Sequence, residues 1–369
     1  MSETLRRKRA IILFNLGGPD SPEAVQPFLF NLFNDPAIIS LPNPFRWLLA
    51  KLISTRRAPV AQEIYAHIGG KSPLLELTRD QANALEKALN DGDNGYENRC
   101  FIAMRYWKPF AADTARQVRD WGADEQILLP LYPQFSTTTS GSSVKDWKAA
   151  CAQVGLRTPI KTACCYPTNP GFIDASAEMI RAGYDRAVAQ NKGKPRLLFS
   201  AHGVPVAVIK KRNDPYQLQI EKSAQAVVDK MAIADLDWLV CYQSRVGPME
   251  WIGPSTEHEI ERAGKDGVPL VIVPIAFVTE HSETLVELDI EYREIADHLN
   301  IPVYERVKTV CSHPRFIEGL VSVVEETQKE LDEKGSDDHR IETRGWWCPD
   351  DHSCAVAKQP GPKPADASA

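Results

Sequence analysis

The sequence predicts an α/β protein with two similar Rossmann-like lobes, each built on a parallel sheet. Its short apolar or β-branched runs are continuous rather than alternating, which is typical of parallel strands buried on both faces. Helix-like segments separate these runs, as in βα repeats. Strand-and-loop units of the first half also have counterparts in the second half, in the same order, and this indicates a duplicated lobe.

Eight runs have the pattern of strands. They cover residues 11–18, 100–107, 126–134, 159–167, 197–205, 238–247, 270–278 and 303–310. The segments 77–90 and 215–233 have the length and mixed composition of helices.

Three pairs of segments carry the duplication. LFNLGGP from residue 13 resembles LFSAHGVP from 198, MRYWKP from 104 resembles YQSRVGP from 242, and LPLYPQFSTTTSGSS from 129 resembles VPIAFVTEHSETL from 273. Each loop follows a strand, so we expect binding residues at the carboxyl ends of the strands, in a cleft between the lobes. The Pro- and Gly-rich motif YPTNPG marks the predicted boundary between the lobes, which we place at residues 1–168 and 169–335. Residues 336–369 then form a C-terminal extension whose end is expected to be disordered.

The amino-acid composition excludes some classes of function. An apolar content of 43% suffices for a large core, and a net charge of −6 gives no reason to expect a nucleic-acid partner. No segment supplies the roughly 18 uninterrupted apolar residues of a membrane span, and no signal-peptide core precedes the first strand. We therefore expect a cytoplasmic protein.

Residues 28–53 form an apolar segment interrupted by Pro36, Pro42 and Pro44, for which we expect only short helices. It either packs on its lobe or forms a lip that guides a substrate or rests on a bilayer, with nearby basic residues at the lipid phosphates. Peripheral contact with the inner membrane is thus an alternative to a purely cytoplasmic protein.

His202 is the first candidate for chemistry. It ends an apolar strand, and Gly203 beside it leaves room for a ligand to approach. A neutral imidazole in this position can accept a proton near neutral pH.

The second candidate is acidic. Glu280, Glu283, Glu287 and Glu291 lie three or four residues apart, so at about 100° per residue they fall on one face of a helix. Like charges at this spacing destabilise a helix. Either water screens this face, or the carboxylates move divalent cations or protons.

Cationic and aromatic side chains form the third constellation. If Arg56, Arg57 and Arg105 face the cleft, their forked donors suit carboxylates on a ligand. The rings of Tyr65, Tyr106, Tyr132 and Trp251 would suit a large planar molecule. LGGPDSP and STTTSGSS match neither a P-loop nor a dinucleotide fingerprint.

Taken together, LGGP, RRAP, IGGKSPL, YPQFS, SAHGVP, YQSRVGPMEWIGP and VPIAFVTEHSETLVELDIEY resemble the ferrochelatases, from about Ile11 to Glu330. These enzymes insert ferrous iron into a porphyrin at the end of haem synthesis. The resemblance implies two Rossmann-like lobes with the porphyrin in the cleft between them. It implies Fe²⁺ and protoporphyrin IX as substrates, and no required cofactor.

The resemblance also implies roles for individual residues. His202 matches the active-site histidine and Glu283 the essential glutamate opposite it, the pair being candidates for metal contact. Glu287, Asp289 and Glu291 continue an acidic path that begins at Glu280. The porphyrin-pocket positions are Leu16, where some members have methionine, with Tyr65, Ser72, Arg105, Tyr106 and Trp251.

Some ferrochelatases hold a two-iron two-sulfur cluster on four cysteines. Here the C-terminal region offers only Cys348 and Cys354, and Thr137 stands where one type of relative has its central cysteine. Cys164 or Cys165 could complete a set only if the C-terminal region folds back, since a cluster needs about four thiolates.

The leading interpretation is a protoporphyrin ferrochelatase, with a coproporphyrin ferrochelatase or a non-catalytic porphyrin or metal carrier as alternatives. The sequence is compatible with a monomer or a homodimer.

Overall fold

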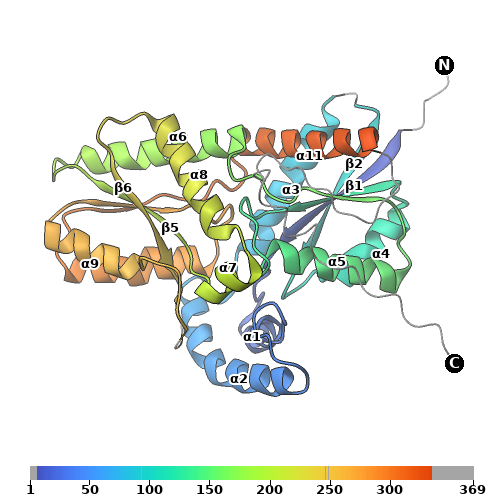
Figure 1. Ribbon diagram of the computed structural model, residues 1–369, viewed down its shortest axis with the longest axis horizontal. Coiled ribbons are helices and arrows are strands. Elements are labelled where there is room, and N and C mark those ends of the chain that lie inside the picture. Colours follow the sequence, from blue (N-terminus) through green and yellow to red (C-terminus); the bar gives the residue numbers. More distant parts are fainter. Residues whose placement is uncertain (1–5, 93, 246, 248, 335–369) are drawn as a thin grey trace.

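The computed structural model describes residues 6–334, apart from positions 93, 246 and 248. Within these residues, eight strands form two parallel sheets (Figure 1). The first sheet consists of β1 (Arg7–Asn15), β2 (Tyr96–Met104), β3 (Glu125–Pro130) and β4 (Ile160–Thr162). The second consists of β5 (Arg196–His202), β6 (Asp237–Gln243), β7 (Leu270–Pro274) and β8 (Tyr304–Arg306). Each of the eight strand-like runs overlaps one of these strands, although five strands begin one to four residues before the predicted run, so the strands are confirmed in number and place.

Both sheets have the same topology. The strand order is β2-β1-β3-β4 in the first and β6-β5-β7-β8 in the second. The three loops that resemble each other in sequence therefore occupy equivalent positions, after β1 and β5, after β2 and β6, and after β3 and β7. The two-lobed α/β fold predicted from the sequence is confirmed.

The strands form where the sequence is continuously apolar because both faces of each sheet are covered. Ile11, Ile12 and Leu13 of β1 are fully buried, as are Leu197 and Leu198 of β5. One large apolar cluster runs through both halves of the chain, from β1 and β3 to β5, β7 and the last helix. The lobes therefore share one apolar core, and each lobe also has a smaller cluster of its own on the other face of its sheet.

Helices cover the sheets and alternate with the strands along the chain. They are α3 (Leu74–Asn90), α4 (Ala111–Trp121), α5 (Ser140–Val154), α6 (Pro170–Val188), α7 (Val206–Arg212), α8 (Tyr216–Met231), α9 (Thr256–Asp266), α10 (Tyr292–His298) and α11 (Pro314–Lys334). Their ends follow ordinary capping chemistry: Asn169 and Ser255 accept backbone N–H groups at the starts of α6 and α9. Gly122 and Gly155 end α4 and α5 in the left-handed conformation.

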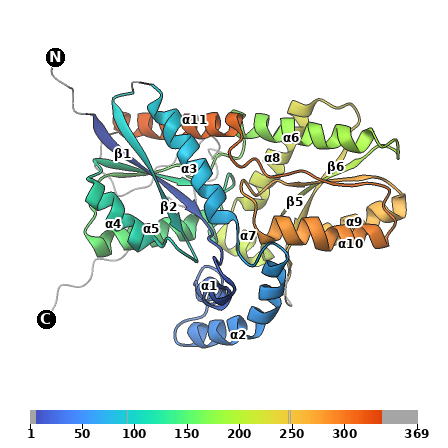
Figure 2. The same ribbon diagram turned by 180° about the vertical axis from the view of Figure 1, so that it is seen from behind.

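Helix α11 joins the two lobes. It continues the line of α6 in both views and packs against α6 and against α3 of the first lobe (Figures 1 and 2). The crossing with α6 is close because two glycines meet there: a Cβ on Gly319 would lie 3.0 Å from the Cα of Gly171.

The apolar segment 28–53 contributes to α1 (Val25–Phe33) and α2 (Phe45–Ala66), which lie together beneath the two lobes, at the bottom of Figure 1. The expectation of only short helices is wrong for α2, which has 22 residues. Pro44 stands at its N-cap, where a missing N–H costs nothing, and the helix accommodates Pro59 in its interior.

Large apolar side chains remain exposed on this pair of helices and the loop that joins them. They are Ile38, Leu41, Phe45, Trp47, Leu48, Leu52 and Val60. None of the helices in the described part of the chain is long and apolar enough to cross a membrane.

Candidate active site

The two leading candidates, His202 and Glu283, come together at the carboxyl edge of the second sheet. His202 is the last residue of β5, and Glu283 is the first residue of a π-helix (Glu283–Glu291) that follows β7. Neighbouring parallel strands β5 and β7 bring their ends to the same place. As a result, His202 Nε2 lies 3.7 Å from Glu283 Oε1, and both side chains remain partly exposed.

The backbone determines which nitrogen of His202 is free. Nδ1 lies 2.6 Å from the carbonyl oxygen of Gly203, which can only accept a hydrogen bond, so Nδ1 carries the proton. In the neutral ring Nε2 then has a free lone pair on the side of Glu283. Such an imidazole is ready to accept a proton at Nε2.

Glu283 lies between two histidines. His281 Nε2 is 3.4 Å from its other carboxylate oxygen, Oε2. Burial alone would raise the pKa of Glu283, but the charge of His202 and the hydrogen bond and charge of His281 outweigh it and lower the pKa to about 2. Glu283 is therefore held as a carboxylate between two imidazoles.

His281 was given no role in the sequence analysis. Its ring packs on Phe277, with the ring centroids 4.6 Å apart. Among the described residues, buried Nδ1 of His281 has no hydrogen-bond partner. The sequence feature that could have indicated a role for His281 is its position in the loop after β7, two residues before Glu283.

The acidic residues do not form the uniform α-helical stripe expected from their spacing. Glu280 precedes the helix, and the helix itself is of the π type. Glu280 and Asp289 both pair with the guanidinium of Arg306. Burial raises the pKa of Glu280, but the charge of Arg306 and the bonds from Thr284 and Thr309 outweigh this effect, and its pKa falls below the usual value.

Glu287 and Glu291 continue from Glu283 toward solvent. Glu287 accepts hydrogen bonds from the side chain of Gln243, from the backbone and hydroxyl of Ser244, and from the hydroxyl of Tyr292. Glu291 is exposed, and its pKa is raised by partial burial and by neighbouring acids such as Glu287, while His67 opposes the shift. Of these two residues, Glu291 is the exposed one, and Glu287 is already well hydrogen-bonded.

Arg105 and Tyr106 lie in the loop after β2 and converge on one carboxylate, that of Asp35. Arg105 Nη2 lies 2.8 Å from Asp35 Oδ2, and the hydroxyl of Tyr106 donates to the same oxygen at 2.9 Å. Ser142, which accepts a hydrogen bond from Arg105, donates to Asp35 as well. Tyr106 is fully buried, and burial together with the nearby Asp35 charge raises its pKa strongly.

Asp35 was missed in the sequence, where it lies between two apolar runs of the segment 28–53. It is 4% exposed and links the end of α1 to the loop after β2. Its partners are distant in sequence, so no local pattern indicates the contact.

Tyr65 brings α2 to the site. It is buried, and its hydroxyl accepts a hydrogen bond of 3.4 Å from Ser282, next to Glu283. Its pKa rises to about 12, first because of burial and further because of the Glu283 charge, while the bond from Ser282 lowers it. The helix that carries the exposed apolar residues therefore also contacts the loop between β7 and Glu283.

Leu16 and Ser72 lie in the first lobe, where LGGP meets IGGKSPL. Leu16 packs with the cluster that contains Tyr65 and Tyr106. A Cβ on Gly18 would lie 2.5 Å from the side chain of Ser72, so the glycine is needed for this packing.

Trp251 lies beside His202 in the second lobe. A Cβ on Gly203 would meet the carbonyl oxygen of Gln243 at 3.0 Å and the ring of Trp251 at 3.3 Å. Gly203 thus allows close packing of protein groups. This differs from the sequence interpretation, in which its missing side chain left room for a ligand.

Arg56 and Arg57 lie on α2, and Tyr132 lies in the loop after β3. Both arginines are exposed on α2, and Arg57 lies over the ring of Phe33. Tyr132 packs with the apolar cluster of the first lobe, near Arg105, and burial is the largest cause of its raised pKa.

Cys164 and Cys165 are buried between β4 and α6, where each is 2% exposed. Cys348 and Cys354, the other cysteines considered for a cluster, lie outside the described residues. Over residues 6–334 with their three gaps, no three His, Cys, Asp or Glu side chains are arranged to hold a metal ion.

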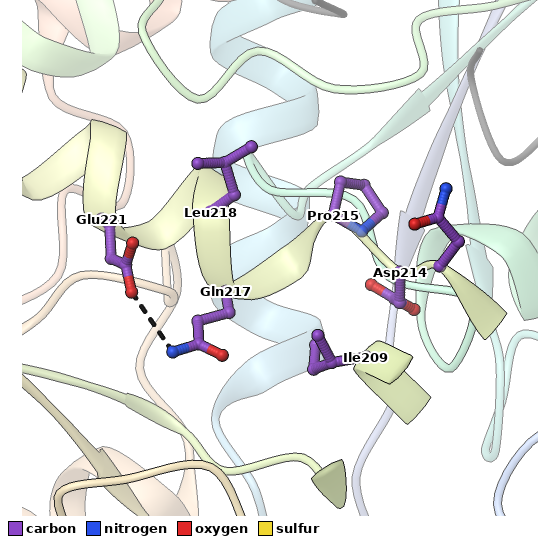
Figure 3. A pocket seen from close by; sticks show the side chains of 7 residues that line it. Ile209, Asp214, Pro215, Gln217, Leu218 and Glu221 are labelled. Atoms are coloured by element: carbon purple, nitrogen blue, oxygen red, sulfur yellow. Dashed lines mark hydrogen bonds between the residues drawn. The ribbon is translucent and has the colours of Figure 1, made fainter. Parts of the chain in front are cut away.

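A pocket of about 280 Å³ lies elsewhere, at the junction of α7 and α8 (Figure 3). Its lining is Ile209, Asn213, Asp214, Pro215, Gln217, Leu218 and Glu221, which includes none of the predicted site residues. The carboxylate of Asp214 accepts hydrogen bonds from Ser136, Thr137 and Tyr216. It therefore joins α8 to the loop after β3.

Comparison with known proteins gives consistent results. A family model described as Ferrochelatase matches residues 8–328. A ferrochelatase of Wolbachia sp. subsp. Drosophila simulans (strain wRi) is 53% identical over 316 residues, which cover 86% of this chain and 98% of that relative. One of Caulobacter vibrioides (strain NA1000 / CB15N) is 53% identical, covering 88% and 91%. One of Phenylobacterium zucineum (strain HLK1) is 49% identical, covering 96% and 99%.

Two solved structures share the fold at low sequence identity. SirB from Bacillus subtilis with Fe³⁺ has a TM-score of 0.51 at 12% identity, covering 90% of this chain and all of that one. The sirohydrochlorin chelatase SirB from Bacillus subtilis subspecies spizizenii, in complex with cobalt, has a TM-score of 0.52 at 11% identity with the same coverage.

Proposed function

The chain belongs to the ferrochelatase family, and from this premise we propose that it inserts Fe²⁺ into protoporphyrin IX to form protohaem. Ferrochelatases are lyases that carry out the last step of haem biosynthesis. The observation that supports catalysis rather than carriage is the His202–Glu283–His281 arrangement, because binding a porphyrin needs no adjacent proton acceptors. Fe²⁺ is a substrate here, and the reaction requires no cofactor.

Metal insertion presents two physical problems. A free porphyrin carries two N–H protons inside its ring, and a flat ring hides its nitrogen lone pairs from a metal that approaches along the normal. A cleft that binds the ring in a bent form exposes those lone pairs, using binding energy from the periphery of the ring.

His202 accepts the two pyrrole protons one after the other at Nε2, passing the first to the Glu283 carboxylate before it accepts the second. Its Nδ1 bond to Gly203 fixes the tautomer, and the Glu283 carboxylate stabilises the imidazolium that forms. The same two side chains are the candidates for contact with the metal. Glu287 and Glu291 carry protons outward or iron inward, starting at Glu283 and ending at exposed Glu291.

The walls of the pocket come from both lobes. Leu16, Ser72, Arg105, Tyr106 and Tyr132 belong to the first lobe, Tyr65 to α2 and Trp251 to the second lobe. Arg56 and Arg57, exposed on α2, are the arginines free to meet ring carboxylates, since Arg105 is already paired with Asp35.

The choice of ring follows from the apolar residues beside the site. Protoporphyrin has two carboxylates and is less polar than coproporphyrin, which has four. The exposed apolar residues of α2, which begins with Phe45, favour the less polar ring.

An anaerobic assay of Fe²⁺ and Zn²⁺ insertion into both porphyrins tests the proposal. We expect turnover with protoporphyrin and a large loss in Glu283→Gln. Preferential turnover of coproporphyrin would assign the coproporphyrin ferrochelatase, and tight porphyrin binding without turnover would assign a carrier.

The same exposed residues support peripheral contact of a cytoplasmic protein with the inner membrane. Trp47 and Leu48 are 47% and 56% exposed, and Lys51 and Arg56 lie nearby on α2. In flotation at low salt the protein is expected to rise with anionic liposomes, and Trp47→Glu/Leu48→Glu is expected to remain below. Val188→Glu, at an exposed apolar position on α6, is the matched control. Absence of the wild type from the floating fraction would contradict this part of the proposal.

A further inference from the structure

Arg306, at the end of β8, holds both ends of the segment that carries Glu283. Its side chain is 5% exposed. Nη1 lies 2.7 Å from Glu280 Oε1, and Nε lies 2.7 Å from Asp289 Oδ1, with Nη2 on the second oxygen of Asp289. One guanidinium thus binds two carboxylates, which a lysine ammonium could not do in the same geometry.

The two carboxylates lie on either side of Glu283 along the chain. Glu280 precedes it by three residues and also accepts hydrogen bonds from Thr284 Oγ1 and, at 2.9 Å, from the backbone of Thr309. Asp289 lies six residues after Glu283 in the π-helix. The start of the catalytic loop and the far part of the helix are therefore both attached to the edge strand of the second sheet.

This attachment matters because the helix is of an uncommon kind. Runs of π-helix are rare and are found mostly at functional sites, and such backbone persists only where the surrounding structure supports it. The acidic residues of the segment repel one another, and Arg306 neutralises two of them inside the protein. The positions of Glu283 relative to His202 and His281 depend on this helix.

We propose that Arg306 is a positioning residue for metal insertion, which fixes Glu283 between the two histidines through its ion pairs with Glu280 and Asp289. This inference rests on the proposed function of Glu283. It assigns Glu280 and Asp289 to the support of the site rather than to a relay. Because the Arg306 side chain is 5% exposed and is paired with Glu280 and Asp289, it is expected to affect the chemical step and to leave porphyrin binding unchanged.

The test compares Arg306→Lys with wild type in the anaerobic insertion assay and in porphyrin binding followed by fluorescence quenching. Since small misplacements of a catalytic group can cost up to about 100-fold in rate, we expect kcat to fall about tenfold, with KM and Kd for the porphyrin within about twofold. Arg306→Lys in the Glu283→Gln background should add little further loss, because both changes act on the same group.

Arg186→Lys is the matched control. Arg186 binds Glu305, the residue next to Arg306, on the exposed surface, and its conversion should leave kcat unchanged. A kcat for Arg306→Lys within twofold of wild type, or parallel losses of kcat, porphyrin affinity and thermal stability, would overturn the inference.

Two further comparisons keep the outcome interpretable. If Glu283→Gln retains turnover, the proposed function of Glu283 fails, whereas an inactive Glu283→Gln with a fully active Arg306→Lys overturns the positioning role alone. If Arg306→Lys does not fold, Asp289→Asn replaces it, since this side chain is 30% exposed. A several-fold loss of kcat is then expected, and wild-type kcat would overturn the inference.

Discussion

At the scale of single residues, one backbone hydrogen bond determines the chemistry of His202. Because Gly203 holds the proton on Nδ1, Nε2 is the basic nitrogen that faces Glu283. General base catalysis contributes about 10²- to 10⁴-fold, so His202→Ala should lower turnover by that range while the porphyrin Kd stays within a few-fold. His298→Ala is the control, since exposed His298 makes the same type of Nδ1 contact, with Glu294. Turnover of His202→Ala within a few-fold of wild type would contradict the assignment.

Glu280 makes the stability of the fold sensitive to acid. Arg306, Thr284 and Thr309 more than offset the effect of burial and hold its pKa below 4.5. A depressed pKa gives stability that is present above the unfolded pKa and is lost as the pH falls through the folded pKa. In urea titrations, the stability difference between wild type and Glu280→Gln should be constant above about pH 5.5 and shrink below about pH 4.5. A difference that does not vary with pH would contradict this ion pair.

The sequence indicated His202 and Glu283 as candidates, and the structure brings these two side chains together, but their other partners were not predicted. His202 ends a strand and Glu283 follows one, and the strand pattern is local and strong. Asp35, Arg306 and the packing of Trp251 on Gly203 depend on contacts between segments far apart in the chain. The types of residues and their spacing along the chain carry no information about such contacts.

At the scale of elements, the acidic segment shows where periodicity misleads. A spacing of three or four residues indicates one face of an α-helix, and the sequence gives no sign that the helix is of the π type. Glu280 lies outside the helix, and its carboxylate is bound by Arg306 and Thr309, contacts from a distant part of the chain that the local spacing does not show. The strands were predictable because their apolar runs are buried on both faces.

The crossing of α6 and α11 is another feature of this scale, and it depends on two glycines. A Cβ on Gly319 would lie 2.3 Å from Asn169 Oδ1, which caps α6, and 3.0 Å from the Cα of Gly171. Gly319→Ala should therefore lower the free energy of unfolding by about 1–3 kcal/mol, as overpacking does, despite the better helix propensity of alanine. Gly92→Ala is the control, since a Cβ there meets nothing within 4 Å. Chemical denaturation measures the free energy of unfolding of both variants. Equal values for Gly319→Ala and Gly92→Ala would contradict the close crossing.

At the scale of the whole molecule, the two lobes are joined by buried polar contacts as well as by their shared core. Gln81 of α3 donates to the carbonyl oxygens of Val278 and Cys311, in the second lobe, and accepts from Thr279. On the other side, Gln134 after β3 donates to Ser223 of α8. The duplication visible in the sequence predicts two lobes, but it does not show that they are bonded together at the catalytic loop.

These contacts make the two lobes one cooperative unit, and two buried thiols can report on it. Cys151 lies in α5 of the first lobe and Cys241 in β6 of the second; burial raises the pKa of each to about 12, so neither reacts with a maleimide while folded. Pulsed maleimide labelling along a urea gradient, with each cysteine quantified by mass spectrometry, should give the same midpoint for both. Independent lobes would instead produce two midpoints. Because Gln81 binds Val278 and Thr279 of the loop after β7, a shared midpoint would show that this loop stays attached to the first lobe until global unfolding.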